Sequence, residues 1–297
     1  EGAEITAYHV GFVLGPCINA SGRLDTATRA LALLCAEKRE EAEKLAGDLY
    51  DLNQSRKAMT EQGKERAIEE IEIGGLNKDR VLVVYLSECH ESLAGIIAGR
   101  IRELYHKPAF VLTKAENGVK GSGRSIEAYS MYEELVKCSD LLTQFGGHPM
   151  AAGLSLEEEN VERFRRKLNE QSGLTEEDLV EKVTIDVPMP IHYIRKDLVQ
   201  ELSLLEPFGK GNEKPLFAQK NLWVSQMRVF GKNRNVVKMR LTDENGYPMD
   251  GVYFGNGDEF AEEGRGKRKI SIVYYPDINM YQGRESLQVI IRHYQFD

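Results

Sequence analysis

Two short segments of this chain set a polar or basic side chain among glycines. Residues 121–125 read GSGRS, and residues 146–153 read GGHPMAAG. Because glycine has no Cβ, the backbone at such positions can approach a ligand or another backbone closely. Each segment alone is typical of a tight turn, but their occurrence close together favours a site for an anion, with Gly146 and Gly147 beside it.

Four side chains are candidates for contacts in this site. Ser122 and Arg124 alternate along an extended segment, so they point to the same side, and the arginine fork suits a phosphate or a carboxylate. His148 fits a hydrogen-bond donor or a proton-transfer group, or alternatively a buried histidine bonded to backbone. Arg23 precedes an expected helix start, where backbone N–H groups favour an anion; the alternative is a surface arginine beside a helix cap.

Patterns that would hold a metal are absent from the sequence. It contains no Asp-x-Asp, no Asp-His-His and no His-x-x-x-His, although phosphodiester hydrolysis usually needs clustered Asp and His for two metals. The four cysteines are widely spaced without a CxxC pair, which argues against a zinc site and a disulfide framework and favours a reducing cytoplasm. We therefore expect this chain to bind no metal itself.

The composition is that of a soluble globular protein. Hydrophobic residues make up 41% and charged residues 29% of the 297 residues, and no apolar run reaches the roughly 18 residues of a membrane helix. The first residues carry neither Met nor a secretion signal, so we expect the chain to begin inside a larger protein. The net charge of −8 argues against a nucleic-acid partner, but phosphate binding needs only a local basic face.

The hydrophobic pattern predicts an α/β part followed by an all-β part. Small residues up to Asp25 indicate loops, then a helix over 27–34 capped by Asp25 or Thr26, and a long polar helix over 37–73 with a possible kink at Gly63. Alternating strands and helices then predict a small α/β domain with a mixed sheet. Its expected strands are 80–85, 108–112, 119–125 and 151–156, and its expected helices are 92–105, 132–142 and 160–171.

After an acidic linker, only strands are expected from residue 215 onward. Five short strands over 222–230, 235–242, 249–254, 269–275 and 285–293 suggest a small β-barrel. The predicted organisation is a connecting region (1–75), the α/β domain (76–175), a linker (176–214) and the barrel (215–297).

The expected barrel mixes cations with aromatic residues. Base stacking on aromatic rings combined with neutralised phosphates is how such barrels bind single strands. The alternative is an ordinary barrel whose aromatic residues form the core. The cations are Arg228, Lys232, Arg234, Lys238 and Arg240, and the aromatic residues are Trp223, Phe230, Tyr253 and Phe254.

Several motifs, in order, resemble those of RecJ-type exonucleases. GGHPMAAG resembles the signature of the DHHA1 domain, and GSGRS precedes it at the family's spacing. Residues 15–23 (GPCINASGR) look like the segment that joins the catalytic DHH domain to a long helix. Residues 205–212 (LEPFGKGN) are similar to the linker before the family's OB-fold barrel, and residues 283–288 (GRESLQ) to its last strand. Cys89 departs from the pattern, since tryptophan is common there.

The resemblance implies a bacterial exonuclease that digests single-stranded DNA from 5′ to 3′ with Mn²⁺ or Mg²⁺ in recombination and repair. It implies that Ser122 and Arg124 contact the terminal or scissile phosphate, that Gly146, Gly147 and His148 lie at the scissile region, and that Arg23 contacts a nearby phosphate. The metal-binding DHH domain would lie N-terminal to Glu1, so we expect this chain alone to bind single-stranded DNA and to cut nothing.

The implied partners are single-stranded DNA, the DHH domain of the same polypeptide, and a single-strand-binding protein or a helicase, without a membrane. Two other functions remain open. One is a scaffold that recruits proteins without touching DNA. The other is a DHHA1-type phosphatase acting on oligoribonucleotides or nucleotides, against which the barrel and its linker argue.

Overall fold

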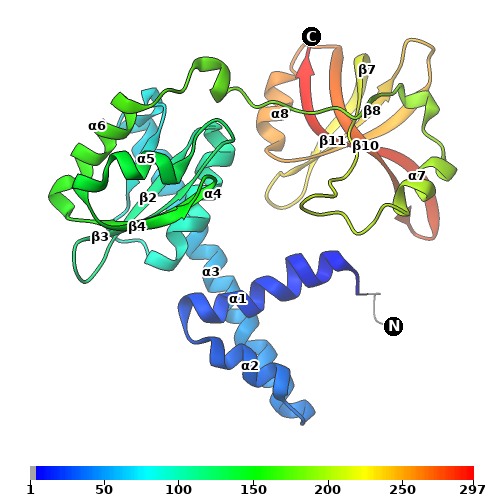
Figure 1. Ribbon diagram of the computed structural model, residues 1–297. Helices are drawn as coiled ribbons and strands as arrows, with labels where there is room; N and C mark the ends of the chain where they lie inside the picture. Colours follow the sequence, from blue (N-terminus) through cyan, green and yellow to red (C-terminus); the bar gives the residue numbers. More distant parts are fainter. Residues whose placement is uncertain (1–4) are drawn as a thin grey trace. The chain divides into compact units, whose positions relative to one another are not determined.

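The computed structural model describes residues 5–297 and divides into two compact units, Glu1–Glu181 and Lys182–Asp297. The first unit contains a group of helices and a five-stranded sheet (Figure 1). The second contains a sheet that closes on itself. Within the described part of the chain, no helix combines the length and the apolar character needed to span a bilayer.

The chain begins with helices where loops were expected. A π-helix (His9–Leu14) runs into α1 (Gly15–Leu24), and α2 (Ala27–Cys35) follows. The expectation of loops was wrong because small residues here serve helix packing: Ala20 and Ser21 are buried, and α1 contacts α3. The Ser21 hydroxyl donates to the Ile18 carbonyl at 2.8 Å, which keeps this serine satisfied inside a helix. Thr26 precedes α2 without a side-chain cap.

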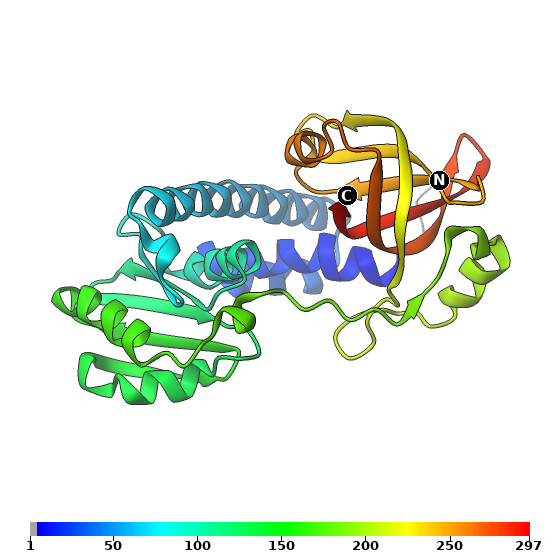
Figure 2. The same cartoon turned by 90° about the horizontal axis from the view of Figure 1, so that it is seen from above.

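Helix α3 (Arg39–Ile73) is a single helix of 35 residues, so it spans about 50 Å. Figure 2 shows it running beside α1. The helix continues through Gly63 without interruption, and Gly63 allows close packing. A Cβ there would lie 2.5 Å from Ile97 Cδ1 of α4 (Ala94–Tyr105). Helix α3 thus carries the N-terminal helices and packs directly against the α/β domain.

The first sheet has the strand order β1-β2-β3-β5-β4, with β1 and β2 parallel and the other neighbours antiparallel. One strand of this sheet was not predicted. Strand β4 occupies residues that were expected to be the end of a helix and a turn, so α5 is shorter than predicted. The strands are β1 (Leu82–Tyr85), β2 (Ala109–Lys114), β3 (Val119–Arg124), β4 (Leu142–His148) and β5 (Ala151–Leu156), and the further helices are α5 (Met131–Lys137) and α6 (Val161–Gln171).

The two faces of this sheet are covered to different extents. On one face, Phe110, Leu112 and Leu154 belong to a core that includes Leu135 of α5 and Phe164 of α6. On the other face, α3 and α4 pack on β1 and β2, and no residue of β4 or β5 belongs to that second core. Helix α4 also contacts β3. The half of this face formed by β5 and β4 is therefore left open.

The second unit is built around five strands that close into a ring. Strand β7 pairs with both β8 and β10, so the order β7-β8-β9-β11-β10 returns to β7, and β6 adds a short parallel strand beside β7. This confirms the predicted fold class of an α/β part followed by a five-stranded closed sheet. The strands are β6 (Val187–Pro188), β7 (Phe217–Phe230), β8 (Val236–Thr242), β9 (Pro248–Phe254), β10 (Lys269–Tyr281) and β11 (Arg284–Phe296).

The expectation of strands alone after residue 215 was wrong. Helix α8 (Gly257–Glu263) lies between β9 and β10, and α7 (Lys196–Ser203) precedes the ring. Both are too short for a clear helical period in the sequence. Phe260 of α8 is fully buried, with its ring centroid 4.3 Å from that of Tyr294. The short 3₁₀ helices are Leu76–Lys78, Glu91–Leu93, Ser139–Leu141, Glu158–Asn160, Glu176–Leu179 and Ile191–Tyr193.

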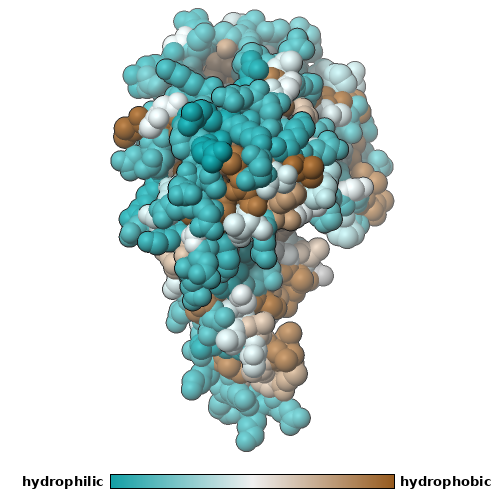
Figure 3. All heavy atoms as spheres, turned by 60° about the vertical axis from the view of Figure 1, so that its left-hand side comes forward, coloured by the Kyte–Doolittle hydropathy of each residue, from teal (hydrophilic) through white to brown (hydrophobic). Residues whose placement is uncertain are grey.

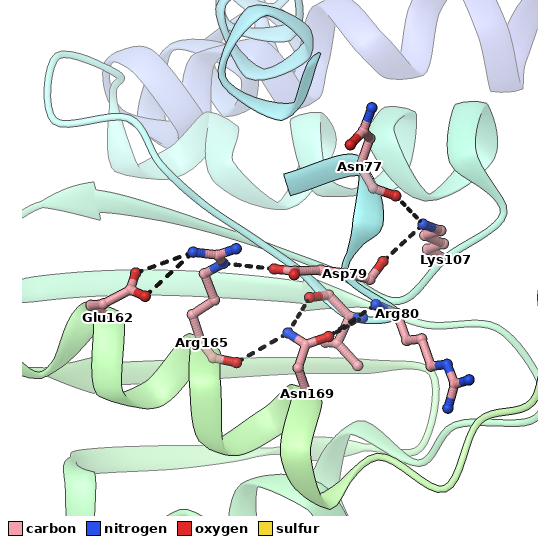
Figure 4. Close-up of polar contacts among 8 residues, drawn as sticks. Asn77, Asp79, Arg80, Lys107, Glu162, Arg165 and Asn169 are labelled. Atoms are coloured by element: carbon pink, nitrogen blue, oxygen red, sulfur yellow. Dashed lines mark hydrogen bonds and ion pairs between the residues drawn. The ribbon is translucent and has the colours of Figure 1, made fainter. Parts of the chain in front are cut away.

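A polar network fixes α6 to the start of β1 (Figure 4). The Asn169 amide oxygen accepts the backbone N–H groups of Arg80 and Val81 at 2.9 and 3.0 Å, and its nitrogen donates to the Val81 carbonyl at 2.9 Å. Arg165 donates to the Asp79 carboxylate at 2.6 Å. Val81 is fully buried, so Asn169 satisfies backbone groups that water does not reach.

We expect Asn169→Ala to lower the free energy of unfolding of the first unit by about 2 kcal/mol, because it leaves buried backbone groups unpaired. Urea denaturation followed by circular dichroism measures this loss. Trp223 is the only tryptophan and lies in the second unit, so its fluorescence transition should not move. Asn160→Ala is the control, since Asn160 accepts only from Arg163; an equal loss in both variants would contradict the assignment.

Candidate phosphate-binding site

The strand register places the glycine-framed residues on one face of the sheet. Arg124 pairs with Ala151, which pairs with His148. One row away, Ser122 pairs with Gly153, which pairs with Gly146. Directly paired residues project to the same face, and residues two apart along a strand do so as well. Ser122, Arg124, Gly146 and His148 therefore share the face that α4 covers only in part.

A cleft of about 700 Å³ lies over the open half of this face. Its floor is formed by small residues, including Gly146 and Gly153, and a Cβ at Gly146 would meet no atom within 4 Å. Glu91 and Lys120 lie on its wall and form an ion pair at 2.9 Å. Hydroxyl and amide groups supply the other polar contacts, from Ser92, Thr113, Ser122, Gln144 and Ser155.

Arg124 is held at the edge of the region that α4 covers. Its Nη1 donates to the Gly123 carbonyl at 2.7 Å, and a Cβ at Gly95 of α4 would lie 2.7 Å from Nη2. Among the described residues, Arg124 has no carboxylate partner. Burial first, and then the charge of Arg23, lowers the pKa of Arg124. A guanidinium group that is partly buried and close to another cation is stabilised by any anion that binds next to it.

Arg23 lies in the last turn of α1, and the expected helix, α2, begins shortly after it at Ala27. Its Nη1 donates to the carbonyl of Ser92 at 2.9 Å, a residue on the cleft wall. This contact joins α1 to the beginning of α4. Because Arg23 also influences the pKa of Arg124, the two guanidinium groups act on the same small region.

Arg56 of α3 is a third member of this group, and sequence reasoning missed it. Burial is the main cause that lowers the pKa of Arg56, followed by the charge of Arg23, and Cys17 opposes these two effects. Its guanidinium donates twice to Asn53 Oδ1, at 3.1 and 2.9 Å. An arginine on a long polar helix resembles any solvated charge. The sequence signal that could have pointed to Arg56 is Asn53, a polar residue that falls within the narrow buried stripe of α3.

Arg23, Arg56 and Arg124 come from three different elements, and in the described part of the chain none of them forms an ion pair with a carboxylate. We call this group the arginine cluster. Unneutralised guanidinium groups that converge repel one another unless an anion lies between them. Their planar forks match phosphate oxygens in geometry as well as in charge.

His148 ends strand β4 and is exposed, and within the described residues its side chain has no hydrogen-bond partner. The alternative of a buried histidine is therefore wrong. Residues 146–148 belong to a strand, and the turn lies at Pro149 and Met150. The Pro149 and Met150 carbonyls accept the N–H groups of Met131 at 2.9 Å and Ser125 at 3.0 Å, which fixes this turn.

The other glycines of the two segments serve the core. A Cβ at Gly121 would lie 2.3 Å from Leu112 Cδ2, and one at Gly123 would lie 2.6 Å from Phe110 Cε1. Gly147 has φ +150°, and its Cβ would lie 2.4 Å from the Ala151 carbonyl oxygen. Among these four, only Gly146 has open space at its Cβ position, whereas the other three glycines are required by close contacts with neighbouring side chains or backbone.

The cations of the closed sheet have different surroundings. Arg240 forms an ion pair with Asp250, and Arg234 forms one with Asp258. Arg228 and Lys238 pair across β7 and β8, are exposed, and lack a carboxylate partner among the described residues. Lys232 lies exposed in the turn between the two strands. Tyr253 belongs with the core, since its ring lies 4.8 Å from that of Phe260.

Two domain families match this chain. The DHHA1 domain matches residues 78–173, and the RecJ OB domain matches residues 185–293. Among curated proteins, the single-stranded-DNA-specific exonuclease RecJ of Bacillus subtilis is 37% identical over 95% of this chain and 36% of its own length. The protein of the same name from Escherichia coli is 34% identical over 98% of this chain and 52% of its own length.

Solved structures agree with these matches. RecJ from Thermus thermophilus, in complex with Mg²⁺, superposes with a TM-score of 0.83 at 27% identity, over 99% of this chain and 44% of that chain. The same protein in complex with Mn²⁺ also gives a TM-score of 0.83. The described residues of this chain contain no group of three or more His, Cys, Asp or Glu side chains that could hold such an ion.

The fold and the domain matches define a class of protein in which a DHHA1 domain is followed by an OB domain. This chain belongs to the RecJ family, which confirms the resemblance that its motifs predicted. It spans between about a third and a half of the length of the curated relatives described above.

Gly146 and Gly147 form a matched pair for testing the geometry of the cleft floor. We expect Gly147→Ala to lower the free energy of unfolding by at least about 2 kcal/mol, because its φ and the nearby Ala151 carbonyl both exclude a Cβ. Gly146→Ala should change it by less than about 0.5 kcal/mol. Urea denaturation monitored by circular dichroism compares the two, and similar losses in both would show that the described strand geometry is incorrect.

Proposed function

We propose that this chain is the part of a RecJ-like exonuclease that grips single-stranded DNA. The observation that carries the proposal is the arginine cluster, whose cations lack carboxylate partners among the described residues. Arg23 donates to Ser92 on the wall of the cleft, and Arg124 shares a strand face with Ser122, which also lines it. Single-stranded DNA supplies phosphates to these cations and leaves its sugars and bases to the hydroxyl and amide groups of the cleft wall. Ser122 and His148 lie on the same face and are assigned to the phosphate nearest the reaction.

The whole enzyme is proposed to hydrolyse single-stranded DNA from its 5′ end, in recombination and repair in the cytoplasm. Hydrolysis would use Mn²⁺ or Mg²⁺ bound by the DHH domain, and the residues described here would orient the strand for that step. A single-strand-binding protein or a helicase would deliver the unpaired strand. Arg228, Lys232 and Lys238 add a second basic surface, whereas the ion pair with Asp250 reduces the contribution of Arg240.

We also infer that the N-terminal helices provide the surface on which the DHH domain packs. Large apolar side chains are exposed there, as the brown spheres in the lower part of Figure 3 illustrate. Exposed apolar patches of this kind mark protein contacts. The exposed fraction reaches 72% for Phe12, 59% for Leu31 and 71% for Leu34.

Binding of a fluorescent 5′-phosphorylated oligonucleotide, followed by anisotropy, tests the gripping role. We expect Arg124→Ala to weaken binding about tenfold, because it removes a charge-assisted hydrogen bond to phosphate. The dependence of log K on log salt should also become shallower by about one phosphate contact. Arg39→Ala is the control, because Arg39 is exposed and pairs with Glu43. Equal affinity in both variants would contradict the proposed site, and absence of binding in the wild type would favour the scaffold function.

A second test concerns catalysis by the chain alone. With Mn²⁺ and end-labelled single-stranded DNA, we expect no release of nucleotides, because the proposed metal site belongs to the DHH domain. In the anisotropy assay described above, an oligoribonucleotide competitor tests the phosphatase alternative, since a phosphatase relative acting on RNA would bind it preferentially. Release of 5′ nucleotides by the purified chain would contradict the proposal that this chain binds the DNA and the DHH domain cuts it.

A further inference from the structure

Each member of the arginine cluster is oriented by a neutral oxygen atom. Arg23 and Arg124 donate to main-chain carbonyls at 2.9 and 2.7 Å. Arg56 donates through Nε and Nη2 to the side-chain oxygen Oδ1 of Asn53, at 3.1 and 2.9 Å. A main-chain carbonyl is present whatever the local sequence, whereas the acceptor for Arg56 depends on the residue at position 53. Asn53 is therefore an orienting group that a substitution can change.

Many arginines elsewhere in the described chain are held in a different way, by carboxylates. Arg165 donates to Asp79 at 2.6 Å, and Arg39 donates to Glu43 at 2.8 Å. A carboxylate fixes a guanidinium group but also neutralises its charge, so little attraction for a second anion remains. An amide oxygen accepts the same N–H groups and leaves the positive charge in place. Other arginines that form ion pairs with carboxylates are Arg29, Arg80, Arg100, Arg195, Arg234, Arg240 and Arg265.

Asn53 is part of the packing between α1 and α3. It is 3% exposed and lies in the buried stripe of α3, with Leu49 one turn before it. Its amide nitrogen Nδ2 donates to Cys17 Sγ of α1 at 3.4 Å, which leaves Oδ1 directed at Arg56. A buried amide costs more desolvation than an apolar side chain of similar size, so packing alone would favour leucine here. The asparagine therefore indicates a demand other than packing.

Arg56 lies half-buried on α3 and keeps donors for a further partner. Its Nε and Nη2 groups bond Asn53, and within the described residues its Nη1 group bonds no acceptor. The charge of Arg23 acts on Arg56, and neither arginine has a carboxylate partner in the part of the chain that the structure describes. A fixed cation beside a second cation is stabilised when an anion approaches both.

We propose that Asn53 is a positioning residue, which presents Arg56 to a phosphate of the bound strand without neutralising it. This inference rests on the proposed function and adds to it a residue that itself contacts no DNA. The proposal accounts for an asparagine at this position. An aspartate would hold Arg56 more tightly but would remove its charge, and a leucine would leave its guanidinium group free to turn away.

Two variants of the full chain separate the orientation of Arg56 from its charge. Binding of the fluorescent 5′-phosphorylated oligonucleotide is followed by anisotropy at several salt concentrations. We expect Asn53→Asp to weaken binding about fivefold and to make the salt dependence shallower by about one phosphate contact, because the new carboxylate neutralises the guanidinium group. Asn53→Leu should weaken binding about threefold with an unchanged salt dependence, because the charge remains but is no longer held in one orientation.

Gln54→Glu is the matched control for added negative charge. Gln54 is the next residue of α3 and is exposed, so this change adds the same charge to the same helix but on its solvent side. We expect it to weaken binding less than about twofold, because solvent and salt screen an exposed charge. Combining Asn53→Asp with Arg56→Ala completes a double-mutant cycle, in which Asn53→Asp should have no further effect once the arginine is absent.

The outcomes separate the positioning role from the proposed function. If the unaltered chain does not bind the oligonucleotide, the proposed function fails, and the positioning role fails with it. If Arg124→Ala weakens binding but Asn53→Asp does not, the gripping role stands and the positioning role of Asn53 is wrong. The positioning role is also wrong if Gln54→Glu has an equal effect, if Asn53→Asp still weakens binding without Arg56, or if its effect follows a loss of stability in urea.

Discussion

The close approach of α4 to its neighbours is the constraint on which the first unit depends. Gly63 of α3 admits Ile97 of α4 on one side, and Gly95 of α4 admits Arg124 on the other. A larger side chain at either glycine would push α4 away from α3 or from the sheet. The same packing brings α3, α4 and β3 within reach of one another, so the arginine cluster is a consequence of backbone proximity and not only of charge.

The sequence allowed prediction of those features that depend on short-range patterns. The alternation of Ser122 and Arg124 follows from the period of a strand, and the long helix follows from its apolar stripe. Tertiary context decided the rest. Small residues around Gly15 and Gly22 resemble a loop, yet they permit helix packing, and the glycines of β4 concealed a strand. Arg56 was missed because its proximity to the charge of Arg23 on α1 depends on how the helices pack, which the apolar stripe of α3 does not determine.

Charge in this chain is organised locally. The net charge of −8 coexists with an arginine cluster and with the exposed pair Arg228 and Lys238. Many other cations have carboxylate partners within reach, as Arg165 has in Asp79 and Arg234 in Asp258. Local pairing leaves the surplus acidic charge on the remaining surface, where it is screened over about 10 Å at moderate salt. An acidic protein can therefore present short basic surfaces to a polyanion.

Closure of the second sheet limits which parts of it can recognise a ligand. In the ring of β7, β8, β9, β11 and β10, each strand has a partner on both sides. Where a strand is paired on both sides, its backbone is not free to recognise a ligand, although residues 275–281 of β10 pair with β11 alone. Over the doubly paired length, ligand preference is expressed by outward-facing side chains, which can be exchanged without altering the inner core. The ring is a fixed platform whose specificity can vary independently of its stability.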